Sequence, residues 1–168
     1  MLSNQELLAH IPWGLVADLM LKNHWQLATA ESCTGGLIAA ACTDLAGSSA
    51  WFERGFVTYS NASKTEMLGV DAALIARHGA VSEEVVRAMV LGTLAHSRAQ
   101  VALAVTGVAG PTGGSAEKPV GTVWLGWATP AGVTTEKCVF DGDRTAIRKA
   151  TVRCAAIQLA ALLQQGRT

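Results

Sequence analysis

Apolar residues recur along the chain at two spacings, one typical of helices and one typical of strands. An apolar residue at every third or fourth position predicts a helix with one buried face. The first such series consists of Leu8, Ile11, Leu15 and Leu19. Pro12 either kinks this helix or starts its second half. Spacing and capping residues together predict helices over 4–22, about 36–45, 62–68, Asp71 to Gly79, from Ser82 onward, and after Asp141-Gly142-Asp143-Arg144.

Polar residues beside these segments supply the expected helix caps. Asn61 precedes the helix over 62–68 and is expected to be its N-cap. Asp71 and Ser82 are expected to cap the next two helices. The buried stripe of the last helix is expected to consist of Ile147, Ala150, Cys154, Ile157 and Ala161.

Short apolar runs rich in β-forming residues predict strands between the helices. They cover 26–30, Phe52 to Ser60, Val101 to Thr106, 120–128 and 133–140, the last two joined into a hairpin. Helices interleaved with buried strands favour an α/β fold, a three-layer α/β/α sandwich with a mixed, mostly parallel sheet and a terminal β-hairpin. Residues 1–168 contain no internal repeat, linker or low-complexity segment, so we expect a single domain.

Composition narrows the class of protein without naming a function. Of the 168 residues, 50% are hydrophobic and 15% are charged, which is typical of a compact domain. The 13 basic and 13 acidic residues cancel and no segment concentrates lysine or arginine, so neither nucleic acid nor a membrane surface is an expected partner. The sequence has no signal peptide and no run of 18 apolar residues, so the cytoplasm is the expected location.

Tryptophans and cysteines add two smaller expectations. The low charge content and the exposed-looking Trp13, Trp25 and Trp51 favour a homodimer. The cysteines are Cys33, Cys42, Cys138 and Cys154. They lack CxxC spacing and nearby histidines, so we expect no zinc site, and buried free thiols are favoured over a disulfide.

Three connections rich in glycine and hydroxyl groups follow predicted strands, at 31–36, 106–115 and 141–145. Ligands of open α/β sheets bind beyond the carboxyl ends of the strands, so we expect these connections to meet in one small-molecule site. Ser32 stands between a strand and a helix, where the helix N-terminus favours negative charge. It is a candidate nucleophile beside a backbone oxyanion or phosphate site, and the alternative is an ordinary N-cap serine.

A nucleophilic serine needs a base, and the histidines offer none. They are His10, His24, His78 and His96. Because none lies beside a glycine-rich strand end, a Ser-His-Asp triad is poorly supported. Lys64 is the better candidate, since burial in the first turn of a helix lowers the pKa of an amine. Tyr59, the only tyrosine, is suited to relaying a proton or stacking on a flat ring. The alternatives are a solvated Lys64 and a core Tyr59.

The loop over 107–115 matches neither the P-loop pattern nor the dinucleotide pattern GxGxxG. Its glycines suit a backbone that wraps a phosphate or a sugar, and the alternative is an irregular connection. Arg144 adds a fork-shaped donor suited to a monophosphate, unless it is an ordinary surface arginine.

Six strings that span nearly the whole chain carry a family resemblance. They are TAESCTGG at 29–36, GSSAWFERGFVTYSN at 47–61, GAVS at 79–82, TGVAGPTGG at 106–114, KPVGTVW at 118–124 and GDR at 142–144. In these strings and their order the sequence resembles the CinA C-terminal domain family. The resemblance implies a stand-alone bacterial form of the domain. It also implies an amidase that converts nicotinamide mononucleotide into nicotinate mononucleotide and ammonia without a metal or cofactor.

Carried over position by position, the resemblance implies catalytic roles for Ser32, Tyr59 and Lys64. Lys64 takes the Ser32 proton with the help of Tyr59, Ser32 attacks the carboxamide carbon, and water releases the acid. Oxyanion donors and substrate contacts are expected from Glu31, Cys33, Thr34, Gly35, Gly36, Thr106, Gly107, Gly110, Gly113, Gly114 and Arg144. The family's loop often reads GPDGG, whereas this chain has Thr112 in place of the acid, which bears on ribose or phosphate contacts.

Two other functions stay open at this point. In the first, Cys33 is the nucleophile, because a helix N-terminus activates a thiol; alkylation then inhibits the enzyme. In the second, the chain is a nucleotide-binding or regulatory module that keeps the pocket and performs no chemistry. The presence of Ser32, Tyr59 and Lys64 together argues against the second function.

Overall fold

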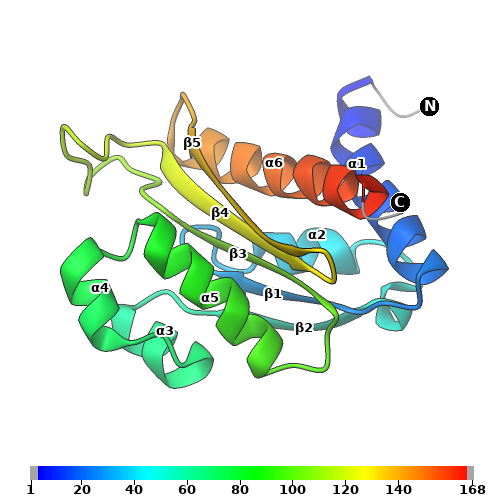
Figure 1. The fold of residues 1–168 in the computed structure, drawn as a ribbon. Helices are drawn as coiled ribbons and strands as arrows, with labels where there is room; N and C mark the ends of the chain where they lie inside the picture. The colour runs from blue at the N-terminus through cyan, green and yellow to red at the C-terminus, as the bar shows by residue number, and fades with distance from the viewer. Residues whose placement is uncertain (1–3, 166–168) are drawn as a thin grey trace.

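In the computed structural model, which describes residues 4–165, five strands form one open sheet in the order β2-β1-β3-β4-β5 (Figure 1). They are β1 (Leu27–Glu31), β2 (Phe52–Val57), β3 (Val101–Gly107), β4 (Thr122–Thr129) and β5 (Gly132–Val139). β1 is parallel to β2 and β3, while β4 is antiparallel to β3 and β5. β5 therefore runs in the direction of β1, and the expected mixed, mostly parallel sheet with a terminal hairpin is confirmed.

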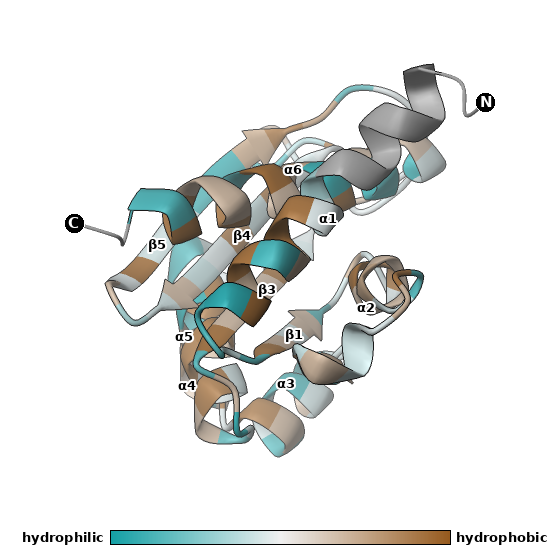
Figure 2. Ribbon diagram, turned by 90° about the vertical axis from the view of Figure 1, so that its right-hand side faces the viewer, coloured by the Kyte–Doolittle hydropathy of each residue, from teal (hydrophilic) through white to brown (hydrophobic). Residues whose placement is uncertain are grey.

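Helices cover both faces of this sheet (Figures 1 and 2). They are α1 (Asn4–Lys22), α2 (Leu37–Thr43), α3 (Asn61–Leu68), α4 (Ala72–His78), α5 (Glu83–Ala95) and α6 (Arg144–Gln165), with a short 3₁₀ turn at Ser48–Ala50. α1, α2 and α6 contribute to one hydrophobic core, and α3, α4 and α5 contribute to the other. This arrangement is the expected three-layer sandwich.

The two cores follow from the alternation of side chains along the strands. In β3, Val101, Leu103 and Val105 belong to the core under α1 and α6. The intervening Ala102 and Ala104 belong to the core under α5. Successive residues of a strand point to opposite faces, so one continuous apolar run fills both layers, as a central strand requires.

The start of α3 differs from the prediction by one residue. Ser60, and not Asn61, is the N-cap: its hydroxyl accepts a hydrogen bond from the Ser63 N–H at 3.1 Å. The Ser63 hydroxyl in turn accepts one from the Ser60 N–H at 3.1 Å, which completes a capping box. Asn61 is therefore the first helical residue, and β2 ends at Val57, before the predicted end at Ser60. The expected caps of α4 and α5 are confirmed.

The buried face of α6 is rotated away from the predicted stripe. Ile147 is buried as expected, but Ile157 is 48% exposed, and the other predicted positions are only half-buried. The buried residues are Ile147, Thr151, Ala155, Ala156, Leu159, Ala160 and Leu163. Alanines on this face let α6 lie close to the sheet, where the Trp127 indole N–H donates to the Ala155 carbonyl at 3.1 Å. Alanine adds little to an apolar pattern, which is why larger side chains misled the prediction.

The tryptophans expected at the surface give no support for a homodimer. Trp13 and Trp51 are only 4% and 1% exposed, and Trp25 is half-buried. Their burial reflects the large apolar area of the indole ring, which the first core accommodates. The side chains of Leu8, His10 and Ile11 lie outside the described residues.

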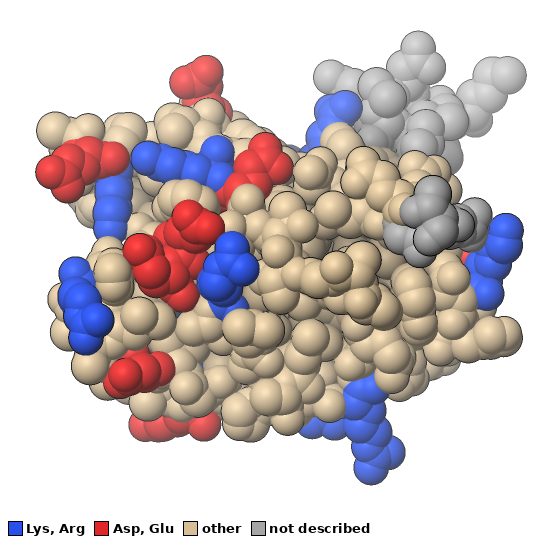
Figure 3. Space-filling view, in the orientation of Figure 1, with Lys and Arg blue, Asp and Glu red and all other residues tan. Residues whose placement is uncertain are grey.

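Charge and hydropathy of the described residues agree with the composition. Figure 3 shows acidic and basic side chains interspersed on one face, beside a broad uncharged area. Between residues 4 and 165 no helix has the length and apolar character to cross a membrane. The four cysteines are free thiols, as expected, with Cys33 and Cys42 buried and the other two half-buried.

Candidate active site

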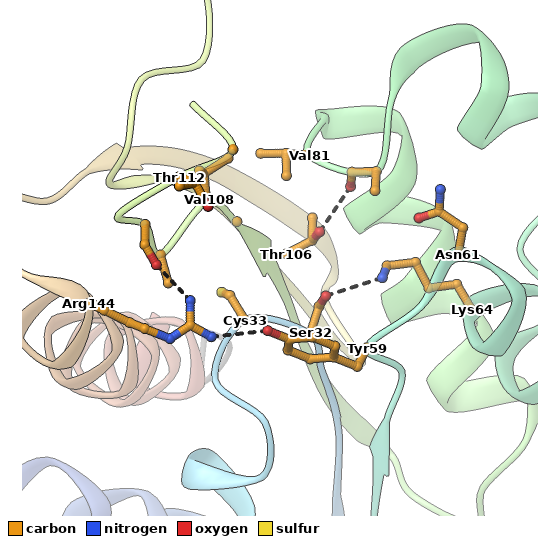
Figure 4. Close-up of a pocket in the computed structure, with 15 residues that line it drawn as sticks. Ser32, Cys33, Tyr59, Asn61, Lys64, Val81, Thr106, Val108, Thr112 and Arg144 are labelled. Carbon is orange, nitrogen blue, oxygen red and sulfur yellow. Dashed lines mark hydrogen bonds between the residues drawn. The ribbon is translucent and has the colours of Figure 1, made fainter. Parts of the chain in front are cut away.

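The carboxyl ends of β1, β2, β3 and β5 lie at one edge of the sheet, where a cavity of about 300 Å³ opens (Figure 4). The connection after β1 supplies Ser32 and Cys33, the connection after β2 supplies Tyr59, and α3 supplies Lys64. The loop after β3 and Arg144 of α6 complete the lining. The three glycine- and hydroxyl-rich connections thus meet in space, and the cavity is large enough for a small molecule.

Ser32 and Lys64 contact each other inside this cavity. Ser32 directly follows β1, and its N–H donates to the Val105 carbonyl at 3.2 Å, which extends the pairing with β3. The Lys64 Nζ donates to the Ser32 Oγ at 3.2 Å and to the Thr58 carbonyl at 2.8 Å. The serine is 8% exposed and the lysine 1% exposed. Two side chains that bulk water scarcely reaches are therefore held at hydrogen-bond distance.

Burial sets the chemistry of Lys64. Desolvation lowers the pKa of its amine below the ordinary value of 10.5, because the charged form loses its hydration. No carboxylate among the described residues forms an ion pair with it to offset that loss. Lys64 is therefore not a solvated surface lysine, and the neutral amine that a general base requires forms at lower pH than it does for a lysine in water.

Tyr59 and Arg144 close one side of the cavity. Tyr59 is 60% exposed, so it is not a core residue. Its hydroxyl accepts a hydrogen bond from Arg144 Nη2 at 3.0 Å, and Nη1 of the same guanidinium donates to the Gly110 carbonyl at 2.8 Å. Arg144 thereby links the β2–α3 connection to the glycine-rich loop, with further N–H groups left for a ligand.

The glycine-rich loop lines the cavity along most of its length up to Gly113. The lining residues from this segment are Thr106, Gly107, Val108, Ala109, Gly110, Thr112 and Gly113. Thr106 bridges to the opposite wall, since its hydroxyl donates to the Ala80 carbonyl at 2.9 Å. Gly114, expected as a substrate contact, does not line the cavity; a Cβ there would lie 2.8 Å from the Val120 backbone nitrogen, so close packing explains the glycine.

Glu31 lies outside the cavity and holds α2 in place. Its two carboxylate oxygens accept hydrogen bonds from the N–H groups of Ile38 and Ala39, at 2.8 and 3.0 Å. A buried carboxylate thus occupies the first turn of α2, which sequence reasoning assigned to the substrate or an oxyanion. Thr34, Gly35 and Gly36 likewise do not line the cavity. Among residues 33–36, Cys33 alone lines it.

Cys33 lies beside the candidate nucleophile and is a poor one itself. Burial raises the pKa of its thiol to about 11, and the Arg148 and Lys64 cations lower it less than burial raises it. The expected activation by a helix N-terminus is absent, because Cys33 precedes α2 by several residues and Glu31 occupies that terminus.

Sequence reasoning gave no site role to five residues that line the cavity, namely Asn61, Ala80, Val81, Val108 and Ala109. Asn61 faces it from the first turn of α3, next to Lys64 (Figure 4). Val81 lies in the string GAVS, which carried the resemblance without an assigned role, and Val108 was read only as part of the loop. Val81 follows Ala80 and Val108 follows Gly107, and both valines lie in connections between regular elements. This position, beside a small residue in a connection, is the only feature of the sequence that could have indicated a site role for them.

Known proteins resemble this chain in sequence and in fold. The model of the CinA C-terminal domain matches residues 13–163. A protein of Enterobacter agglomerans named nicotinamide-nucleotide amidohydrolase PncC is 62% identical over 125 residues, 74% of this chain and 76% of the relative. A protein of Pseudomonas putida with the same name is 60% identical over 141 residues, 84% of this chain and 86% of the relative. The crystal structure of a competence-damaged protein (CinA) superfamily member from Klebsiella pneumoniae superposes with a TM-score of 0.90 at 39% identity, covering 94% of this chain and 98% of that one.

Proposed function

The chain belongs to the CinA C-terminal domain family, and we propose that it is an amidase that hydrolyses nicotinamide mononucleotide to nicotinate mononucleotide and ammonia. The names of the two amidohydrolase relatives, which match this chain over most of their lengths, support the substrate. The observation that carries the proposal is the 3.2 Å contact between Lys64 Nζ and Ser32 Oγ in the cavity. A hydroxyl beside a buried amine is a nucleophile and base suited to opening an amide.

In the first step, neutral Lys64 removes the proton of Ser32. The Thr58 carbonyl holds one N–H of the amine at 2.8 Å, which orients the nitrogen. With the amine neutral, the hydrogen bond to Ser32 reverses, and the hydroxyl donates to the nitrogen lone pair. The lowered pKa of Lys64 favours that state.

Ser32 Oγ then attacks the carboxamide carbon of the substrate. A C–O bond forms, and the protonated Lys64 gives its proton to the departing nitrogen as the C–N bond breaks and ammonia leaves. The acyl ester on Ser32 is hydrolysed by water, with Lys64 again taking the proton, which releases the carboxylic acid. The backbone beside Cys33, which lines the cavity, is the nearest candidate for stabilising the oxyanion.

The rest of the nucleotide lies along the glycine-rich loop. The 5′-phosphate binds the remaining N–H groups of Arg144 and the backbone near Gly110, where the guanidinium is already anchored. Thr112, which lines the cavity in place of the family's acid, offers a hydroxyl to the ribose or the phosphate without charge repulsion. The exposed ring of Tyr59 is free to stack on the pyridine ring. Its hydroxyl helps the proton transfer.

Ammonia and nicotinate mononucleotide formation from nicotinamide mononucleotide tests this proposal. We expect equimolar products from the wild type, and none above background from Ser32→Ala or Lys64→Met. Free nicotinamide and the nucleoside are the controls for the phosphate contact, and both are expected to react more slowly. Binding of the nucleotide by a well-folded wild type without any turnover would reject the amidase and leave the non-catalytic module.

A further inference from the structure

Arg148 of α6 binds the backbone turn that carries Ser32. Its Nε donates to the Cys33 carbonyl at 3.1 Å, and its Nη2 donates to the Thr34 carbonyl at 3.0 Å. Two bonds from one planar guanidinium to consecutive carbonyls fix both the distance and the orientation of this segment. Arg148 is half-buried and is not among the residues that line the cavity, so its effect on Ser32 passes through the backbone.

The turn contains two glycines, which restrict the backbone less than other residues do. Gly35 and Gly36 both adopt positive φ, at 58° and 104°, which the chain reaches easily and also leaves easily. Within the turn, the Gly35 N–H donates to the Ser32 carbonyl at 3.0 Å. A Cβ on Gly35 would lie 3.5 Å from Arg148 Nη2, so the guanidinium rests directly against the turn.

Two charged side chains thus hold the segment from opposite ends. The Glu31 carboxylate fixes the start of α2, as described above, and Arg148 fixes the residues between Ser32 and that helix. Loss of Arg148 takes a donor from both carbonyls, and the Thr34 carbonyl keeps only the Leu37 N–H, at 3.2 Å, so the turn relaxes toward water or another donor. Ser32 is the residue next to the loosened pair.

We propose that Arg148 is a positioning residue, which keeps the Ser32 Oγ aligned with Lys64 by holding the Cys33 and Thr34 carbonyls. The effect on turnover rests on the proposed amidase function, whereas the effect on Ser32 itself does not. A misplacement of about 1 Å is enough to cost about 100-fold in rate, so small shifts of this turn matter.

Arg148→Ala, Arg148→Lys and a matched control, Arg153→Ala, test the role. Arg153 is an exposed arginine on the same helix. We expect Arg148→Ala to lower kcat about 10- to 100-fold with KM changed less than about twofold, and the control to match the wild type. Lysine replaces one of the two bonds and restores part of the rate, and guanidinium ions added to Arg148→Ala also restore part of it. The melting temperature of each variant shows whether it is folded at the assay temperature.

Labelling of Ser32 by a fluorophosphonate probe, followed by intact mass, separates this inference from the substrate proposal. We expect labelling to slow in Arg148→Ala in parallel with kcat, and to be unchanged in Arg153→Ala. If nicotinamide mononucleotide is not hydrolysed but Ser32 of the wild type reacts, the labelling rates alone decide the role of Arg148. Equal labelling rates in the wild type and Arg148→Ala overturn the inference. A decrease in the labelling rate that is no larger than the unfolded fraction of Arg148→Ala overturns it as well. A wild-type Ser32 that does not react with the probe, in a protein that does not hydrolyse the nucleotide, overturns both proposals.

Discussion

Lys64 Nζ lies 3.2 Å from Ser32 Oγ although the lysine is only 1% exposed, so the contact places a titratable amine where its charged form is disfavoured. The two residues meet because β1 and β2 are parallel neighbours, with Glu31 opposite Val57 in the register. The chain leaves both strands at the same edge of the sheet, and the first turn of α3 brings the lysine back over the serine. Burying an amine away from water lowers the free energy of unfolding. Here the buried amine lies beside a hydroxyl, which is the arrangement that a serine nucleophile and its base require.

Lys64→Met is expected to lower turnover strongly and to stabilise the fold. Methionine has a similar length and removes the desolvated amine, so the melting temperature should rise while kcat falls by about 10²- to 10⁴-fold. Lys64→Arg should also be inactive, since a guanidinium stays protonated at working pH. Lys137→Met, at an exposed position of β5, is the control and should change neither quantity. Steady-state ammonia release with differential scanning fluorimetry measures both, and activity of Lys64→Met within a fewfold of wild type would exclude a lysine base.

The pH dependence follows from the lowered pKa of Lys64. The neutral, basic form of Lys64 is populated at pH values below the ordinary lysine pKa of 10.5. The value of kcat/KM should therefore rise with pH through the folded-state pKa of Lys64 and level off before pH 10.5. The folded state binds fewer protons than the unfolded chain between those two pKa values, so the free energy of unfolding also rises with pH in this window. Lys64→Met lacks that increase. Urea denaturation of both proteins from about pH 6 to about pH 10 checks it, and parallel stability curves would contradict the burial argument.

The residues carried by strand ends were predictable, because pattern and connection are enough to place them. Ser32 and Tyr59 each follow a predicted strand, and Lys64 lies in the first turn of the helix that comes after the second of these strands. Parallel strands bring such positions to one edge. Glu31 was misassigned to the substrate side because an acid at a strand end before two glycines resembles a ligand contact. Its reach to the N–H groups of α2 depends on the positive φ of Gly35 and Gly36, which sequence alone does not determine.

The role of Arg148 was not predictable from the chain for a related reason. In the sequence it is one of several arginines on a long helix, with nothing to separate it from Arg153. Its contacts with Cys33 and Thr34 depend on how the N-terminal end of α6 docks, and the buried stripe of that helix was itself predicted with the wrong rotation. Side-chain roles that arise from docking between distant elements need the three-dimensional arrangement.

Cys33 is expected to be dispensable for chemistry. Because burial raises the pKa of its thiol to about 11, almost none is thiolate near neutrality, and thiolate is the reactive form. Cys33→Ala should therefore keep kcat within a fewfold of the wild type, and brief treatment with iodoacetamide should leave Cys33 unmodified by peptide mass. An inactive Cys33→Ala beside an active Ser32→Ala would instead assign the nucleophile to the thiol.

Tyr59→Phe distinguishes two roles for the phenol. The hydroxyl accepts a hydrogen bond from Arg144, whose other contact is the Gly110 carbonyl, so its loss should loosen the guanidinium and raise KM several-fold. If the hydroxyl also transfers a proton, kcat falls as well. Arg144→Met should raise KM further, because it also removes the phosphate contact, and adding Tyr59→Phe to it should change KM little, because the hydrogen bond that the two residues share is already lost. Additive effects on KM would show that the Tyr59–Arg144 bond has no part in binding.

Gly92→Ala is expected to lower both stability and turnover. Gly92 of α5 packs against the backbone at the end of α3, and an added Cβ would collide with the Leu68 carbonyl oxygen and lie 3.0 Å from the Leu68 Cβ. Relief of that collision pushes α3 away from α5, at a cost of about 1–3 kcal/mol, and carries Lys64, one turn earlier, away from Ser32. Gly14→Ala in α1 is the control: its Cβ meets no described atom within 4 Å, so it should gain about 1 kcal/mol of helix propensity. Thermal denaturation and kcat measure both effects. A Gly92→Ala protein as stable as the wild type would contradict the close packing of α3 on α5 that holds the lysine in place.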